Sequence, residues 1–130
     1  MKINFFVLIF ISFSVQVSAQ LSRTHYIPPI TAASNNNALP QNQYLHISTP
    51  SMSTINVEIN QLGVGVSNFS LSNSSPLEIF IGNGNDTSFV LPLSNTLVQA
   101  SDKGYVIQSE KPVYASVRLT AGNQNQAGSL

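Results

Sequence analysis

Short stretches in which apolar and polar residues alternate recur along this chain. In 43–48, Leu45 and Ile47 fall on one face, as a half-buried strand requires, and Tyr44, His46 and Ser48 fall on the other. The ranges 55–60 and 77–81 repeat this period of two. Only a short segment containing Pro50 separates 43–48 from 55–60, so we expect these two strands to pair as an antiparallel hairpin.

The clearest pattern lies in 104–119. Two apolar stretches, 104–108 and 113–119, flank the Ser-Glu-Lys-Pro of 109–112, which is typical of a turn. We therefore predict a second hairpin here. Residues 89–91 predict another short strand, which Pro92 confines to a sheet edge or a strand end because proline cannot donate to a ladder. The Ser- and Asn-rich range 67–75 is typical of a loop.

These patterns predict the fold class. Beyond residue 19, no window sustains a 3.6-residue period over three turns, whereas short strands recur between turn clusters, as in sandwiches and barrels. We expect an all-β fold, an antiparallel β-sandwich of Greek-key-like order, in 43–130. Residues 20–42 contain Pro28 and Pro29 and show no sustained alternation, so we expect an extended N-terminal arm before pairing begins. Residues 121–130 add no compact closing element, and we expect a chain truncated at its C-terminus.

The N-terminal segment predicts export. Lys2 precedes an apolar run at 5–11, and Val17-Ser18-Ala19 has the small-residue pattern of a cleavage site. A membrane-spanning helix needs about 20 apolar residues, so we interpret 1–19 as a removable signal peptide, with an uncleaved anchor as the alternative. We expect a secreted or cell-surface protein with no stable membrane span after cleavage.

Composition then narrows the function classes. Charged residues make up 8% of the chain and the formal net charge is zero, so Ser, Thr, Asn and Gln supply its polarity. The cations Arg23, Lys103, Lys111 and Arg118 are too dispersed for a nucleic-acid-binding patch, and we expect no nucleic-acid partner. The absence of cysteine excludes thiol catalysis and thiolate zinc sites.

Candidate catalytic and metal-binding residues are sparse. His25 lies in the predicted arm, His46 lies in mid-strand, and no Gly-x-Ser-x-Gly motif accompanies them. The five acidic residues are scattered over different predicted strands and turns. The run 82–87 offers oxygen ligands for calcium but lacks the carboxylates of a calcium loop, which favours a plain turn. We expect no enzyme activity, no cofactor and no metal.

Binding residues are easier to suggest. Tyr44, Tyr114 and Arg118 lie on strand faces opposite the aliphatic residues, and these residue types are enriched at binding hot spots. His46 shares the face of Tyr44. We therefore take Tyr44, His46, Tyr114 and Arg118 as candidate ligand-binding residues, with ordinary cross-strand packing as the alternative.

Three segments carry a resemblance to a known family: LSRTHYIPPI at 21–30, QYLHISTPS at 43–51 and KPVYASVRL at 111–119. Together they resemble the N-terminal region of large surface proteins from gliding, type IX-secreting Bacteroidota. Those proteins are labelled as gliding-motility-associated or as carrying a type B sorting domain, and the region is similar to the N-terminal domain of IgGFc-binding protein. In that family the sorting domain lies at the far C-terminus, and these 130 residues do not include it. The resemblance implies adhesion or matrix contact without naming a ligand.

Together these observations predict an exported adhesion or binding module, the N-terminal part of a larger gliding-motility-associated or adhesin-like protein. Its expected partners are an extracellular protein or glycan, or neighbouring domains of a longer chain. The alternative is a structural strut of a surface filament or extracellular matrix, whose strand edges engage neighbouring domains. An enzymatic role, such as a carbohydrate-active accessory domain, is a third and less favoured hypothesis.

Overall fold

The computed structural model describes residues 21–31, 40–84, 89–91, 97, 99–121 and 127–129. Throughout these ranges the secondary structure consists of strands, and no helix there is long and apolar enough to cross a membrane. The predicted signal peptide and Pro92 lie outside the described residues. The strands are β1 (Ser22–Ile27), β2 (Ile30–Thr31), β3 (Pro40–Ser48), β4 (Ile55–Gln61), β5 (Gly65–Leu71), β6 (Leu77–Asn83), β7 (Val90–Leu91), β8 (Tyr105–Ala121) and β9 (Ala127–Ser129).

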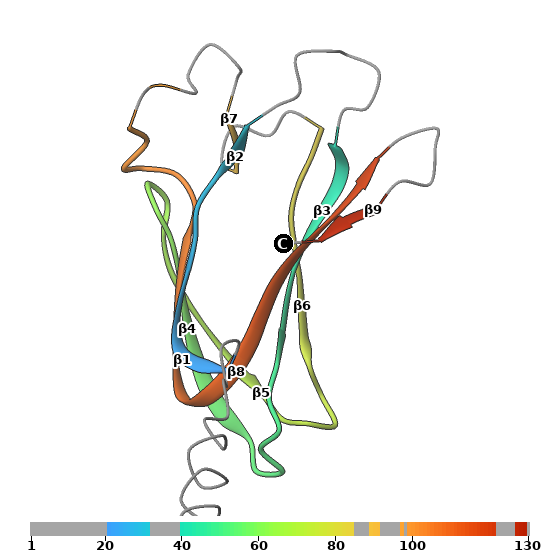
Figure 1. Ribbon diagram of the computed structural model, residues 1–130. Helices are drawn as coiled ribbons and strands as arrows, with labels where there is room; N and C mark the ends of the chain where they lie inside the picture. Colours follow the sequence, from blue (N-terminus) through green and yellow to red (C-terminus); the bar gives the residue numbers. More distant parts are fainter. Residues whose placement is uncertain are drawn as a thin grey trace, which may run out of the picture.

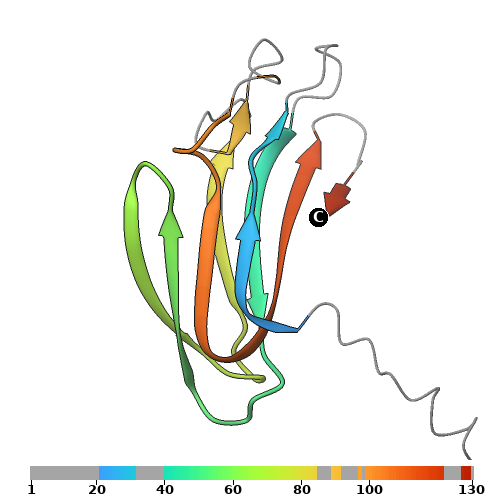
Figure 2. The same cartoon turned by 60° about the vertical axis from the view of Figure 1, so that its left-hand side comes forward.

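Seven of these strands form one curled antiparallel sheet whose two halves face each other (Figures 1 and 2). The first half has the order β1-β8-β4-β5, and the second has the order β6-β3-β8-β9. β8 belongs to both halves. β2 and β7 form a separate two-residue parallel pair. The predicted all-β, sandwich-like fold is therefore confirmed, and the non-consecutive neighbours of β8 agree with the expected Greek-key-like order.

The hydrophobic core lies between the two halves and follows from the alternation in the sequence. Leu45 and Ile47 of β3 are fully buried, and so are alternate residues of β4 and β8, whereas the residues between them face outward. The buried apolar residues are Leu45, Ile47, Ile55, Val57, Ile59, Leu71, Ile81, Phe89, Val90, Tyr105, Ile107, Val113 and Val117.

The predicted hairpin between 43–48 and 55–60 is wrong. β3 pairs with β6 and β8, whereas β4 pairs with β5 and β8, so the two strands lie in opposite halves. The segment between them crosses from one half to the other. Alternation identifies the buried face of a strand but not its neighbour, and both strands bury their apolar faces equally well across the core.

The predicted hairpin over 104–119 is also wrong, although the predicted break in the strand is real. β8 is a single 17-residue strand that bends sharply near 109–112 (Figure 2). Its first arm, 105–109, pairs with β1 and β4, and its second arm, 113–121, pairs mainly with β3. The two arms do not pair with each other, because a strand that bends can pass from one half of a sandwich to the other.

Side chains satisfy three successive backbone carbonyl groups at this bend. Ser109 Oγ donates to the Lys111 carbonyl at 2.7 Å, Thr49 Oγ1 to the Pro112 carbonyl at 3.1 Å, and His25 Nε2 to the Val113 carbonyl at 2.8 Å. These carbonyl groups therefore remain hydrogen-bonded where the ladder is interrupted.

Strand pairing also extends beyond the segments that the sequence predicted. In the described part of the expected arm, β1 pairs with β8, so pairing begins at Ser22. β5 occupies most of the predicted loop 67–75 and pairs with β4 over its whole length. Gly63 in the turn between β4 and β5 has a φ of +78°, and a Cβ there would lie 2.6 Å from the Asp102 carbonyl oxygen, so this turn requires glycine.

Candidate ligand-binding face

All four predicted binding residues lie on the outer face of the second half. Tyr44 of β3 is opposite Arg118 of β8, and Ser48 is opposite Tyr114. His46 lies two residues after Tyr44 and therefore projects on the same side. We call this surface, formed by Tyr44, His46, Phe80, Tyr114 and Arg118, the ligand face.

β6 adds Phe80 and Glu78 to the same face, and neither residue was a candidate from the sequence pattern alone. Phe80 is opposite Tyr44, and Glu78 is opposite His46. The alternation of 77–81 already placed both side chains on the face of the strand that Ile79 does not share. What the sequence did not reveal is that β6 lies beside β3, because this pairing joins strands far apart in the chain.

Aromatic contacts hold the centre of the ligand face. The rings of Tyr44 and Phe80 meet edge to face with centroids 5.6 Å apart, and the rings of Tyr44 and His46 are 6.2 Å apart. Such contacts contribute about 0.5–1.5 kcal/mol beyond area burial and fix ring orientation. Tyr44 is therefore the residue around which this surface is organised.

His46 also contacts an acid. Its Nδ1 lies 3.4 Å from a carboxylate oxygen of Glu78. Its Nε2 is shielded from solvent and makes no hydrogen bond within the described part of the chain. Glu78 therefore contacts the imidazole at Nδ1 alone. This arrangement agrees with ordinary cross-strand packing of His46, the alternative to ligand binding.

The rim of the ligand face is open to solvent. Phe80 is 56% exposed and Tyr114 46% exposed, and Arg118 is exposed as well, whereas Tyr44 and His46 are half-buried. Two half-buried central rings surrounded by exposed aromatic and cationic side chains can be covered by a ligand without rearrangement of the backbone.

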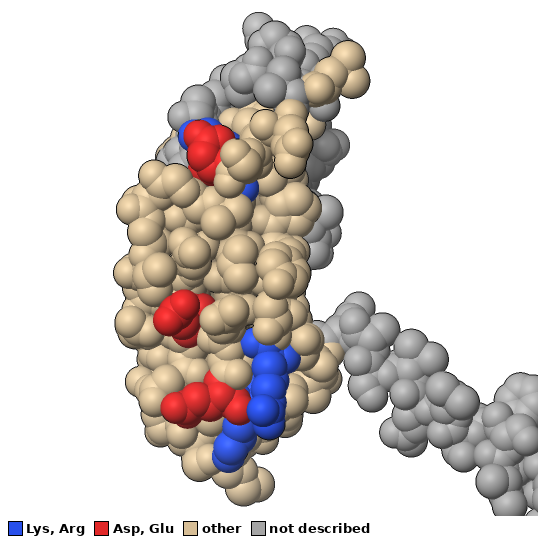
Figure 3. Space-filling model, turned by 90° about the vertical axis from the view of Figure 1, so that its left-hand side faces the viewer, with Lys and Arg blue, Asp and Glu red and all other residues tan. Residues whose placement is uncertain are grey.

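The outer face of the first half has a different composition. We call it the amide face; its outward residues include Asn56, Glu58, Asn68, Ser70 and Gln108, and the exposed Tyr26 and Val66 lie on the same side. Figure 3 shows that charged side chains cover little of this side of the molecule, and that acidic and basic groups lie close together near both of its ends.

A hydrogen-bonded row crosses the amide face beside the bend of β8. Asn56 donates to Glu110 through its backbone N–H at 3.0 Å and through Nδ2 at 2.9 Å, and Ser70 Oγ donates to Asn56 Oδ1 at 3.1 Å. The two hydrogen bonds from Asn56, aided by the nearby charge of Lys111, lower the pKa of Glu110 below its usual value near 4.5. Glu110 thus pairs with the Asn56 N–H where the β4–β8 ladder ends.

Beyond the His46–Glu78 contact, the described candidate metal and catalytic residues form no cluster. In the described ranges, no group of three or more His, Cys, Asp or Glu side chains could hold a metal ion. His25 bonds to the β8 backbone and so has a structural contact. Of the possible calcium run, Gly82 and Asn83 belong to β6, and 85–87 lie outside the described residues.

No protein family, no curated protein and no solved structure shows significant similarity to this chain.

Proposed function

We propose that this chain is an exported adhesion or binding module that holds an extracellular protein or glycan against the ligand face. The observation that carries the proposal is the gathering of Tyr44, Phe80, Tyr114 and Arg118 on one partly exposed sheet face. Aromatic residues and arginine are the residue types that dominate binding energy at interfaces.

The chemistry of the face fits a protein or glycan ligand. Exposed rings offer flat apolar surface that a sugar ring or an apolar side chain can cover, while Arg118 and the His46–Glu78 pair offer polar groups that orient the ligand. The same residue set offers no recognisable nucleophile–base pair, so the proposed role is binding without catalysis.

Export and cellular role rest on the sequence. The signal-peptide pattern of 1–19 supports secretion or display at the cell surface, and the resemblance described above supports a place in a larger gliding-motility-associated or adhesin-like protein. The structural-strut alternative differs in mechanism, because a strut engages its neighbours through strand edges and does not need the ligand face.

A binding screen tests the proposal. The mature chain, 20–130, would be applied to immobilised glycans and extracellular matrix proteins, together with a Tyr44→Ala/Phe80→Ala double variant. Loss of the Tyr44 and Phe80 rings should weaken binding by at least about 30-fold, or about 2 kcal/mol. The matched control is Asn68→Ala on the amide face, which should bind like the wild type. Equal binding by the wild type and the double variant would contradict the proposal.

A further inference from the structure

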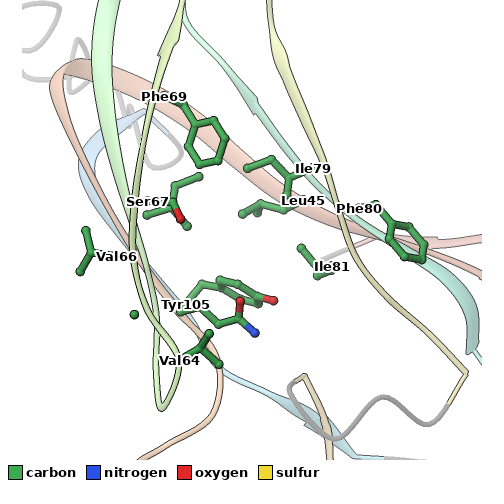
Figure 4. Close-up of a pocket in the computed structure, with 12 residues that line it drawn as sticks. Leu45, Val64, Val66, Ser67, Phe69, Ile79, Phe80, Ile81 and Tyr105 are labelled. Atoms are coloured by element: carbon green, nitrogen blue, oxygen red, sulfur yellow. The ribbon is translucent and has the colours of Figure 1, made fainter.

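A second surface lies where the two halves of the sandwich open. A cavity of about 290 Å³ runs between β5 and β6, the terminal strands of the path β5-β4-β8-β3-β6. Ser67 and Phe69 point into it from β5, and Ile79 and Ile81 from β6, above a floor that includes Leu45 (Figure 4). We call this cavity the edge groove.

The edge groove is uncharged and incompletely covered, and Gln61, Ser67 and Tyr105 add polar groups to its otherwise apolar side chains. None of the described residues that line it carries a charge. Phe69 and Ile79 pack against the core but are only half-buried, and Val64 on its rim is 73% exposed. The groove therefore offers uncharged, partly apolar surface that continues into the core.

The backbone beside the groove indicates what kind of partner fits. Among the described residues, β5 pairs only with β4, so its other edge carries N–H and C=O groups without a ladder partner. Proteins usually protect such edges with charged residues, proline or bulges. β5 has none of these: its sequence is GVSNFSL, and it runs in uninterrupted register with β4. β6, in contrast, carries Glu78 and a register shift.

We propose that the edge of β5 accepts an extended strand of a partner polypeptide, with uncharged aliphatic side chains at alternate positions. The partner's backbone would extend the β4–β5 ladder, and its alternate side chains would fill the edge groove. From Gly65 to Phe69 the inward-facing positions span about 14 Å, which places about three partner side chains over the groove. A charged side chain is disfavoured, because nothing charged in the described lining would compensate its burial.

This site is independent of the proposed ligand face. Although β6 contributes to both, the Phe80 ring points away from the groove (Figure 4). A strand on β5 would therefore leave the ligand face accessible, and either site could prove wrong without affecting the other.

The test uses a synthetic peptide that alternates valine and threonine over seven residues, the length of β5, with a lysine at each end for solubility. It would be titrated to about 1 mM into the isotope-labelled mature chain and followed by nuclear magnetic resonance. We expect amide exchange to slow by about tenfold at alternate β5 residues, and the Phe69 and Ile79 signals to shift.

Two matched variants localise the effect. Ser67→Phe places a ring in the groove and should abolish peptide binding, whereas Asn68→Phe places the same ring on the opposite face of β5 and should leave binding unchanged. A peptide with aspartate in place of its central valine should fail to bind the wild-type chain, a result that does not depend on the folding of any variant.

Four outcomes would overturn the proposal: no protection of β5 at the highest peptide concentration, binding retained by Ser67→Phe, equal binding of the aspartate peptide, or a homodimer in sedimentation whose β5 amides are already protected. The last outcome would assign the edge to a second copy of this chain.

Discussion

The two outer faces of the sandwich have the same strand geometry but very different side chains. On the ligand face, the outward positions of β3 and β6 place Tyr44 beside Phe80 and His46 beside Glu78. On the amide face, the corresponding positions of β4 and β5 place Asn56 beside Ser70 and Glu58 beside Asn68. Alternation determines which residues face outward on both sides. The chemical types differ: aromatic rings contact one another on the ligand face, whereas Tyr26 and Val66 on the amide face lie exposed among amide and hydroxyl groups.

β8 links the two faces, since its first arm belongs to one half and its second arm to the other. The bend therefore places Gln108 on the amide face and Arg118 on the ligand face. Substitutions in the core, at the bend and on the amide face should consequently change stability, while substitutions on the ligand face should change binding.

The largest expected effect is in the core directly beneath the ligand face. Ile47 is 1% exposed, and Ile47→Ala should lower the free energy of unfolding by about 2–5 kcal/mol because it leaves a cavity. Ligand affinity, measured well below the midpoint of thermal unfolding, should stay unchanged. The neighbouring Ser48→Ala, at an exposed position, should alter stability by less than about 0.5 kcal/mol. Similar losses for both variants would show that this part of the core is packed differently.

The second-largest expected loss of stability is at the bend of β8. Thr49 is buried, and Thr49→Val removes the donor to the Pro112 carbonyl and the acceptor for the Ser51 N–H. Leaving these groups unpaired should cost about 1–3 kcal/mol in chemical denaturation. Ser53→Ala is the matched control, because it removes only exposed side-chain hydrogen bonds, with Lys111 Nζ and Ser51 Oγ, near the same bend and should cost less than about 0.5 kcal/mol. A neutral Thr49→Val would mean that this contact does not hold the bend.

The smallest effect is pH-dependent and belongs to the amide face. The pKa of Glu110 is lowered in the folded state, so its carboxylate contributes stability above its usual value near 4.5, and that contribution is lost as the pH falls through the folded-state pKa. The stability difference between the wild type and Glu110→Gln should therefore disappear on going from about pH 7 to about pH 3 in urea denaturation. A difference that does not change with pH would rule out the contribution of the charge.

The sequence predicted the strand faces but not their neighbours. Alternation correctly placed Tyr44 and His46 outward on β3, and Tyr114 and Arg118 outward on β8. It missed β5, because an edge strand needs few apolar residues, and only Phe69 and Leu71 of its inward positions are large. Ser109–Pro112 has the residue types of a turn, but it is a bend within one strand. The side chains of His25 and Thr49 that bond to this bend lie 88 and 63 residues away from their carbonyl partners. Such distant contacts have no local sequence signal.

Residue-resolved mapping of a bound ligand tests the central claim most directly. The strongest ligand from the glycan and protein screen would be titrated into the isotope-labelled mature chain, and the shifts of its backbone amide signals recorded. We predict that the largest shifts occur at Tyr44, His46, Phe80, Tyr114 and Arg118, with little change at Asn56, Glu58 and Asn68. Shifts concentrated on the amide face, with the ligand face unaffected, would contradict the assignment of the aromatic surface as the binding site.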